Sequence, residues 1–264
     1  MAVTNFIQSI WSKKIQDDLE LKCKLVDNCL RDYEGDVKYA QSVKILGVGE
    51  PTIGDYDSTQ DITIEEMSDR GQILTIDQAK YFAFYVDDVN QAQSVPGLPE
   101  KYQAKAVHGL AVARDTYVAE LIAAAENATE VEMTEEGFKK AVDDAIVALR
   151  ERNFDEEGVI EITPAGYNLF KNHLITLSTN NPEYIKKGIV GMYDNMEVIM
   201  SNNLKTPGCV RGKKAIAFAG QINEVEALRA EKRFKDIIRG LDTFGAKIID
   251  EARIQLLVLS GGET

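Results

Sequence analysis

The sequence has few of the residues that carry most enzyme chemistry. Its 264 residues include only two histidines and three cysteines. His108 and His173 have no partner at a metal-ligand spacing. There is no GxSxG segment, and Cys23 and Cys29 lack a local base that would activate a thiol. We therefore expect no catalytic residue, no metal and no cofactor, and we predict that the protein is not an enzyme.

Two glycine-rich segments come close to phosphate-binding loops without matching them. Residues 47–52 lack the third glycine of a dinucleotide loop and place Pro51 inside the turn. Residues 208–214 are one residue short of a P-loop and have no Ser or Thr after the first lysine. The carboxylate pairs at 87–88 and 143–144 are adjacent, so they diverge on a strand or a helix, whereas acid–base work needs convergence.

Basic residues are outnumbered and form no long runs. Lysine and arginine total 30 against 43 aspartates and glutamates, so the formal net charge is -13 and the pI is about 4.7. Lysine pairs such as 139–140 and 213–214 are isolated and are interpreted as solvated surface. An acidic chain repels the phosphate backbone, which argues against a nucleic-acid-binding protein.

Long apolar runs are missing as well. No stretch approaches ~18 uncharged apolar residues, so no transmembrane helix is expected. Residues 1–11 lack the pattern of a signal peptide, and an odd, sparse set of cysteines fits a reducing compartment. We expect a soluble intracellular protein, with enough hydrophobic residues (44%) for the core of one large domain or two small ones.

The first segment has the periodicity of one long helix over residues 4–31. Apolar residues recur there at steps of three and four, which places them on one helical face. The residues on this face are Ile7, Trp11, Ile15, Leu19, Cys23, Val26 and Leu30. Such a helix is not stable alone, so it must lie on this domain or on a neighbouring chain.

A long two-stranded excursion is predicted after that helix. Residues 37–46 alternate like a strand, and Ile62 and Ile64 belong to a short exposed strand. A turn at 68–71 leads to a second strand over 72–86. Because an isolated hairpin is marginal in water, this excursion is expected to lean on a partner.

The rest of the chain contains two further helices and then alternates between α and β elements. Thr134 is placed to cap the second of these helices, and Thr163 with Pro164 has the pattern of a cap followed by a first helical residue. The predicted elements are helices at 100–127, from 134 to about 149, at 164–174 and at 221–228; strands at 158–162, 215–218, 234–249 and 253–259; a hairpin of 189–192 with 196–200 around Asp194–Asn195; and a polar loop at 201–212.

Three groups of residues occur in an order that one protein family shares. Residues 74–88 (LTIDQAKYFAFYVDD) resemble a returning strand and the lead-in to a long helix. Residues 188–204 resemble a G-x-x-G … V-x-x-S-x-x-L hairpin, and residues 215–248 resemble a closing segment that ends in a G-x-x-x-x-G-A-K-V strand. Over residues 35–260 the chain is thus similar to tailed-bacteriophage major capsid proteins, which have the HK-ninety-seven-type fold, and in particular to the P-twenty-two-like coat protein group.

This resemblance implies an α+β fold with three parts. Residues 1–36 would be an N-terminal arm. Residues 37–127 would be a peripheral domain, with an extended two-stranded loop at about 52–86 and a long spine helix at about 100–127. Residues 128–264 would be an axial domain with the closing strands. An amphipathic arm and loop are hard to explain in a monomer, but in a shell each is buried against another copy.

The resemblance also implies a function and its partners. The chain would self-assemble through pentamers and hexamers into an icosahedral shell around a phage double-stranded DNA genome, without sequence-specific DNA binding and without a membrane. A separate scaffolding protein and a portal are expected, with assembly in the host bacterial cytoplasm and a final place in the virion capsid. The residues predicted for subunit contacts are Ile7, Trp11, Ile15, Leu19, Ile62, Ile64, Ile73, Leu74, Asn202 and Asn203.

Two alternatives remain open from the sequence. One is an encapsulin-type compartment of the same fold that houses a cargo enzyme. The other is an ordinary soluble α+β enzyme or binding module, which a stable monomer with a deep polar pocket would favour.

Overall fold

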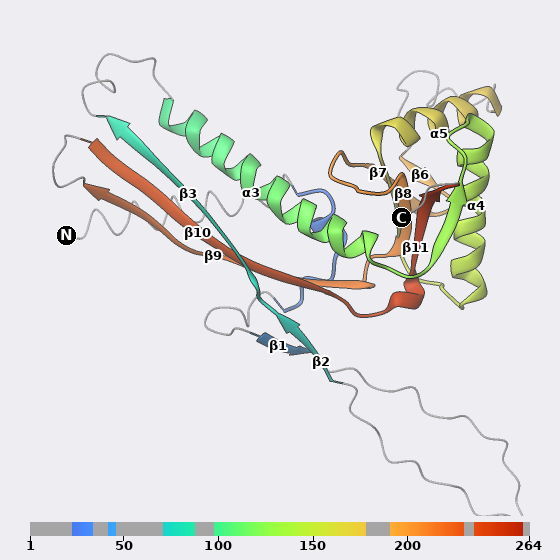
Figure 1. The fold of residues 1–264 in the computed structure, drawn as a ribbon, viewed down its shortest axis with the longest axis horizontal. Helices are drawn as coiled ribbons and strands as arrows, with labels where there is room; N and C mark the ends of the chain where they lie inside the picture. The colour runs from blue at the N-terminus through green and yellow to red at the C-terminus, as the bar shows by residue number, and fades with distance from the viewer. Residues whose placement is uncertain are drawn as a thin grey trace, which may run out of the picture.

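The computed structural model describes residues 23–33, 42–45, 71–87, 98–177, 191–229 and 235–260. Within them the chain is α+β, as predicted, with an elongated part and a compact part at one end (Figure 1). The elements in chain order are η1 (Val26–Asn28), β1 (Ser42–Ile45), β2 (Gln72–Thr75), β3 (Gln78–Asp87), α3 (Leu98–Ala123), β4 (Ala128–Val131), α4 (Glu135–Glu151), β5 (Gly158–Ile162), α5 (Pro164–Leu177), β6 (Met192–Tyr193), β7 (Met196–Met200), β8 (Gly208–Gly212), β9 (Ile216–Arg229), β10 (Lys235–Ile248), η3 (Glu251–Arg253) and β11 (Ile254–Leu259).

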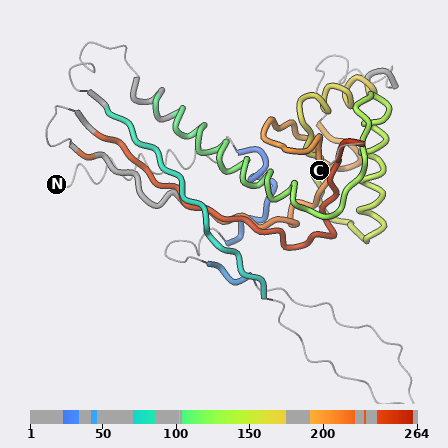
Figure 2. The backbone as a smooth tube through the Cα atoms, viewed as in Figure 1, coloured from blue at the N-terminus to red at the C-terminus, as the bar shows by residue number. Residues whose placement is uncertain are grey.

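The elongated part is a helix lying along a three-stranded antiparallel sheet. The strand order is β3-β10-β9, and α3 runs beside the strands for much of their length (Figures 1 and 2). Small and apolar residues on one side of α3, such as Val107, Ala111 and Val118, are buried against this sheet together with Phe218 and Phe244. Burial of these residues removes apolar surface from water and holds the helix on the sheet.

The compact part is built on a six-stranded mixed sheet of order β4-β11-β8-β5-β7-β6. Helices α4 and α5 pack on it and on each other. As predicted, the Thr134 side chain caps α4 by accepting a hydrogen bond from the Gly137 amide (3.0 Å). The predicted inner face of α4 is buried throughout, and its members are Phe138, Val142, Ala145, Ile146 and Leu149.

A separate two-stranded sheet lies where β2 leads into β3. β1 and β2 pair antiparallel, with Val43 opposite Leu74. Their inward side chains form a small cluster with Ala217 and Ala219 of β9, so this short sheet is anchored on the elongated part. The predicted strand at 72–86 is therefore two strands with different partners: β2 pairs with β1, and β3 pairs with β10. The predicted strand at 62–64 and residues 68–70 of the predicted turn lie outside the described residues.

Most elements with a local signal lie where they were predicted. Strand β5 has the predicted bounds, and the spine helix occurs as α3, which starts two residues earlier and ends four residues earlier than predicted. The hairpin β6–β7 turns at Asp194 and Asn195, which have φ of 49° and 66°. Two successive residues with positive φ are typical of a type I′ turn, which matches the twist of the strands.

Three predictions were wrong because contacts distant in sequence outweigh local pattern. Residues 221–228 are not a helix; they belong to β9, which pairs with β10 along its length. The polar loop at 201–212 ends in the fully buried strand β8. Residues 128–131, for which no element was predicted, form β4 beside β11. The helix predicted over residues 4–31 is wrong for the part that the structure describes. Residues 23–31 contain only the short turn η1, because buried side chains of other elements bind the backbone of this segment.

Candidate assembly surface

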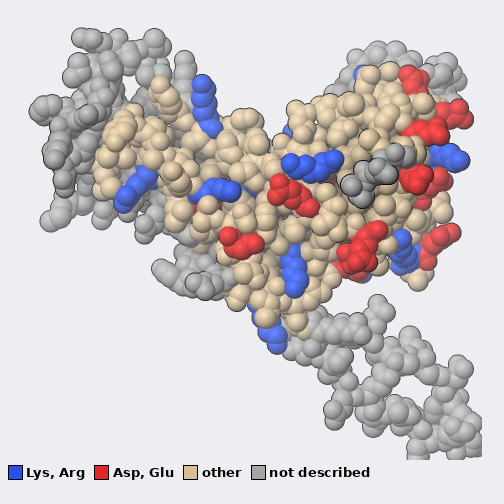
Figure 3. Space-filling model, in the orientation of Figure 1, with Lys and Arg blue, Asp and Glu red and all other residues tan. Residues whose placement is uncertain are grey.

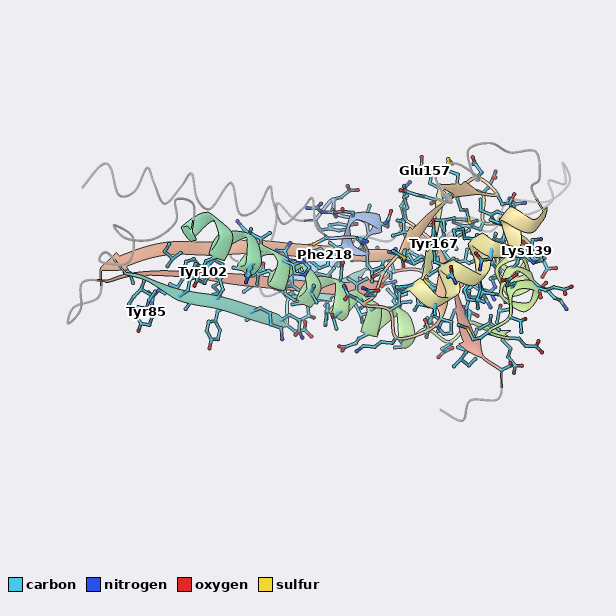
Figure 4. All side chains as sticks on the ribbon, turned by 90° about the horizontal axis from the view of Figure 1, so that it is seen from above. Tyr85, Tyr102, Lys139, Glu157, Tyr167 and Phe218 are labelled. Atoms are coloured by element: carbon cyan, nitrogen blue, oxygen red, sulfur yellow. The ribbon has the colours of Figure 1, made fainter. Side chains whose placement is uncertain are left out.

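The outer face of the three-stranded sheet is apolar and exposed. Strand β3 turns Phe82 and Phe84 towards the core under α3, where Phe84 stacks on Tyr102 with 5.8 Å between ring centroids. The alternate residues Tyr81 and Tyr85 are on the opposite face of the strand and are 80% and 64% exposed. Figure 4 shows Tyr85 pointing away from the body of the protein. Large aromatic side chains left this open are costly in a monomer and are typical of binding surfaces.

Neighbouring strands extend this face. Leu241 of β10 lies directly opposite Tyr81. Ile237 of β10 lies opposite both Tyr85 of β3 and Leu228 of β9, so Leu228 and Tyr85 belong to the same row across the sheet. Both leucines are 41% exposed. We refer to Tyr81, Tyr85, Leu228 and Leu241 as the outer sheet face.

A buried ion pair holds this sheet in place on α3. Arg114 of the helix donates two hydrogen bonds to the Asp242 carboxylate of β10, at 2.9 and 2.5 Å. The guanidinium also lies 5.6 and 5.8 Å from the ring centroids of Phe218 and Phe244. Burial raises the pKa of Asp242, and Arg114 offsets part of that effect. This geometry ties the position of the sheet to that of the helix.

A second buried ion pair joins the compact part to the N-terminal segment. Arg211 of β8 and Glu161 of β5 are both fully buried and bond at 2.7 and 3.0 Å. Arg211 also donates to the backbone carbonyls of Asn28 (2.8 Å) and Leu25 (3.0 Å). The guanidinium therefore satisfies both a carboxylate and the turn at η1, as a buried charge must.

Asp115 of α3 binds the other side of the same segment. Its carboxylate accepts backbone N–H bonds from Lys24 (3.0 Å), Leu25 (3.1 Å) and Val26 (3.3 Å). Leu30 then bridges to Ala217 of β9. Residues 23–30 are thus bound by the helix, the elongated sheet and the compact sheet together, which sets the point where the preceding residues join the body.

The crossing from β2 to β3 is held by several contacts. The Tyr117 hydroxyl donates to Asp77 (3.0 Å), and the amide of Gln72 donates to the Ile249 carbonyl (3.0 Å). Gly245 lies directly under this crossing: a Cβ there would meet the Thr75 carbonyl and the Ile76 Cα (2.9 Å). The close approach of two backbones requires glycine at this position.

The structure places only part of the predicted contact set. Ile7, Trp11, Ile15, Leu19, Ile62 and Ile64 lie outside the described residues. Ile73 is 56% exposed, and Asn202 and Asn203 lie in the exposed-to-intermediate turn after β7. The prediction that Leu74 lies at a subunit contact is corrected by the structure. Its side chain is fully buried in the chain's own core against Val43 and Ala217, because alternate residues of β2 face opposite sides.

Sequence reasoning missed the residues that define the surface and its supports. Tyr81 and Tyr85 were assigned to a strand without their faces being separated, although the alternation Tyr-Phe-Ala-Phe-Tyr carries that signal. The buried charges Glu161 and Arg211 were missed too. The available clue was one charged residue within each of the short apolar strands GVIEI and GCVRG.

The described residues offer little for catalysis. No group of three or more His, Cys, Asp or Glu side chains in this part of the chain could hold a metal ion. The three cysteines are free and buried, and burial raises the pKa of Cys23 to about 12 and that of Cys29 to about 11. Such thiols stay protonated and unreactive. Every helix among the described residues is too short or too polar to cross a bilayer.

Acidic side chains gather at the compact end of the molecule (Figure 3). The compact part also has an exposed acidic run at Asp155–Glu157, where Arg253 pairs with Glu156 (2.7 Å). Lys213 lies near both Glu157 and Glu197. Both basic residues are engaged by carboxylates, so neither contributes to a continuous positive surface of the kind that phosphate binding needs.

Comparison with solved structures identifies the fold. A chain from Mycobacterium phage Che8 matches with a TM-score of 0.75 and 24% identity, over 89% of this chain and 90% of that one. The capsid structure of cyanophage P-SCSP1u matches with a TM-score of 0.73 and 15% identity, over 89% and 86%. A virus-like particle from Pyrococcus furiosus matches with a TM-score of 0.61 and 13% identity, over 95% and 99%.

These matches define the class of fold. The chain has the fold of phage capsid chains, and the capsid fold predicted from the sequence is confirmed. At these identities the shared property is the fold. No protein-family model matches the sequence, and no curated protein is similar enough in sequence to count as a relative.

Proposed function

We propose that this protein is the major capsid protein of a bacteriophage, a shell subunit that assembles with copies of itself. The observation that carries the proposal is the match to capsid chains over about nine-tenths of both partners. The exposed outer sheet face supports it, because four large apolar side chains on one sheet need a second protein to cover them. The role is structural and not catalytic.

The finer parts of the proposal follow from the sequence resemblance. Residues 1–36 serve as an arm and residues 52–86 hold a loop that overlaps a neighbouring subunit. Pentamers and hexamers close an icosahedral shell around double-stranded DNA, with a separate scaffolding protein and a portal. The shell assembles in the host cytoplasm, and its acidic subunits do not trap the genome, since phosphates and carboxylates repel.

Negative-stain microscopy after gel filtration tests the proposal. The purified protein is imaged alone and with its scaffolding protein. We expect closed particles, tubes, or rings of five or six subunits. A clean monomer of 29.3 kDa under every condition, scaffold included, contradicts the shell role and favours a soluble enzyme or binding module.

One observation favours a second candidate, a protein compartment that encloses cargo. The virus-like particle from Pyrococcus furiosus matches over 95% of this chain and 99% of its own. Purified particles separate the two functions. Nuclease-protected DNA inside them supports a capsid, whereas a co-purifying enzyme without nucleic acid supports a compartment.

A further inference from the structure

Strand β3 is an open edge of the elongated sheet. Its ten residues, Gln78–Asp87, all pair with β10 on one side. No other described strand pairs with its second side. It contains no proline, and Lys80 is its only basic residue. Proteins usually protect long apolar edges, because their unpaired backbone groups pair readily with another strand. An unprotected edge of this length is therefore suited to pair with a strand of another chain.

The sequence of β3 is complementary to itself in the antiparallel direction. Residues 81–85 read Tyr-Phe-Ala-Phe-Tyr, which is the same in both directions. If two such strands pair around Ala83, Tyr81 of one copy lies opposite Tyr85 of the other, and Phe82 lies opposite Phe84. Directly opposite residues share a face of the sheet, and aromatic cross-strand pairs stabilise it.

We propose that two copies of this chain join through their β3 edges, antiparallel, with a two-fold axis at Ala83. This inference rests on the proposed shell function and names one of its contacts. The two three-stranded sheets become one continuous sheet across both copies. In this register residues 79–87 of the two copies lie directly opposite each other, from Ala79 opposite residue 87 to residue 87 opposite Ala79, centred on the Tyr-Phe-Ala-Phe-Tyr segment.

The faces of the two copies agree in this arrangement. An antiparallel pair around one residue has its two-fold axis perpendicular to the sheet, so α3 of both copies lies on the same side. The outer sheet face, with Tyr81 and Tyr85, then lies on the other side in both copies. A closed shell requires this agreement, because every subunit must turn the same side inward, and two-fold contacts are self-complementary by symmetry.

Single cysteine substitutions test the register. Ala83→Cys places two thiols on the proposed axis, where opposite Cβ atoms lie about 4.5–5.5 Å apart. Ala79→Cys is the matched control, because Ala79 is also exposed on the same face of β3 but pairs with residue 87 of the second copy. The native cysteines are buried and form no background. Assembled protein is treated with a mild oxidant and, separately, with a short bis-maleimide.

The expected result is about tenfold more covalent dimer for Ala83→Cys than for Ala79→Cys, because only a residue on the axis meets its own copy. Equal cross-linking of both variants, or none in either, overturns the proposal. A second pair of variants tests it without oxidation. Ala83→Lys sets like charges opposite each other and should reduce assembly, while Ala79→Lys should not; circular dichroism confirms that both fold.

Microscopy of the same samples separates this inference from the shell function. Closed particles without cross-linking at Ala83 reject the β3 contact and leave the shell role intact. Cross-linked dimers that never form particles support the β3 contact and reject the shell role. If neither cross-links nor particles form, both the β3 contact and the shell role are rejected.

Discussion

At the residue scale, the interior depends on a few charged side chains that bind distant backbone. Arg211 and Glu161 are fully buried, and Arg211 also binds two carbonyls of residues 25–28. Burial alone would lower the pKa of Arg211, but the Glu161 charge raises it overall. A pair of this kind costs desolvation to bury, yet removing one member leaves an unpaired charge in the core.

Replacement of Glu161 tests this dependence. We expect Glu161→Gln to lower the free energy of unfolding by about 3–5 kcal/mol, because Arg211 loses its counter-charge. Asp194→Asn is the control: it removes an exposed ion pair with Arg150 (2.7 Å) at a position where Asn tolerates the positive φ, and should cost less than ~1 kcal/mol. Urea unfolding measures both. Equal losses would contradict a special role for the buried pair.

Asp115 makes stability depend on pH. Burial raises the pKa of Asp115, and the backbone N–H groups of Lys24, Val26 and Leu25 offset part of this. An acid whose folded pKa lies above its unfolded value destabilises the fold as pH rises, because the unfolded chain releases the proton first. The difference in free energy of unfolding between wild type and Asp115→Asn should therefore fall as pH rises above the ordinary value of 3.8, and then level off. A difference that grows with pH in urea titrations would refute this.

At the element scale, the elongated sheet and the short β1–β2 sheet are joined by one crossing of the chain. β3 and β2 are separated only by Ile76 and Asp77, yet they pair with different strands. The crossing passes over β10 at Gly245 and is held by Tyr117. The direction in which β2 leaves the sheet is therefore set by backbone packing.

Substitution of Gly245 tests the crossing. We expect Gly245→Ala to destabilise the protein by about 1–3 kcal/mol, since the new Cβ overlaps the backbone of Thr75 and Ile76. Gly109→Ala, inside α3 with open space around the new Cβ, should instead stabilise by about 0.5–1 kcal/mol. Thermal unfolding of the two variants should shift in opposite directions. Shifts of the same sign would show that the close approach is not maintained.

At the scale of the whole molecule, residues 23–30 anchor the N-terminal segment in the body of the protein. Residues 23–30 are part of the core, with Leu25 and Val26 buried and their backbone bound by Asp115 and Arg211. Loss of these residues would leave Asp115 without its three backbone donors and Arg211 without two of its acceptors. An arm that contacts a neighbour should therefore be separable from the segment that anchors it.

Two truncations test that division. Removal of residues 1–22 should leave cooperative thermal unfolding unchanged and impair shell closure, as expected for an arm. Removal of residues 1–31 should abolish the fold, because the core loses the segment that Asp115 and Arg211 bind. Circular dichroism and negative-stain microscopy measure the two effects. Intact closed shells from the shorter truncation would count against the arm as an interface.

Elements with a local chemical signal were predictable. Thr134 caps α4, Thr163 and Pro164 begin α5, and Asp194–Asn195 turn the β6–β7 hairpin, each as expected. Each signal acts within a few residues, so the sequence carries it directly. The order of these elements was also enough to indicate the capsid fold.

The sequence by itself determined the acidic charge, the spine helix, the local caps and turns, and the β3 segment that reads the same in both directions. Only the tertiary structure decided that residues 221–228 pair with β10, that residues 23–31 form a bound turn, and that Tyr81 and Tyr85 face outward on an edge strand. The same physical reason applies to all three features. Strand pairing and burial of charge depend on partners far away in the chain, and a periodic pattern cannot show which partner is present.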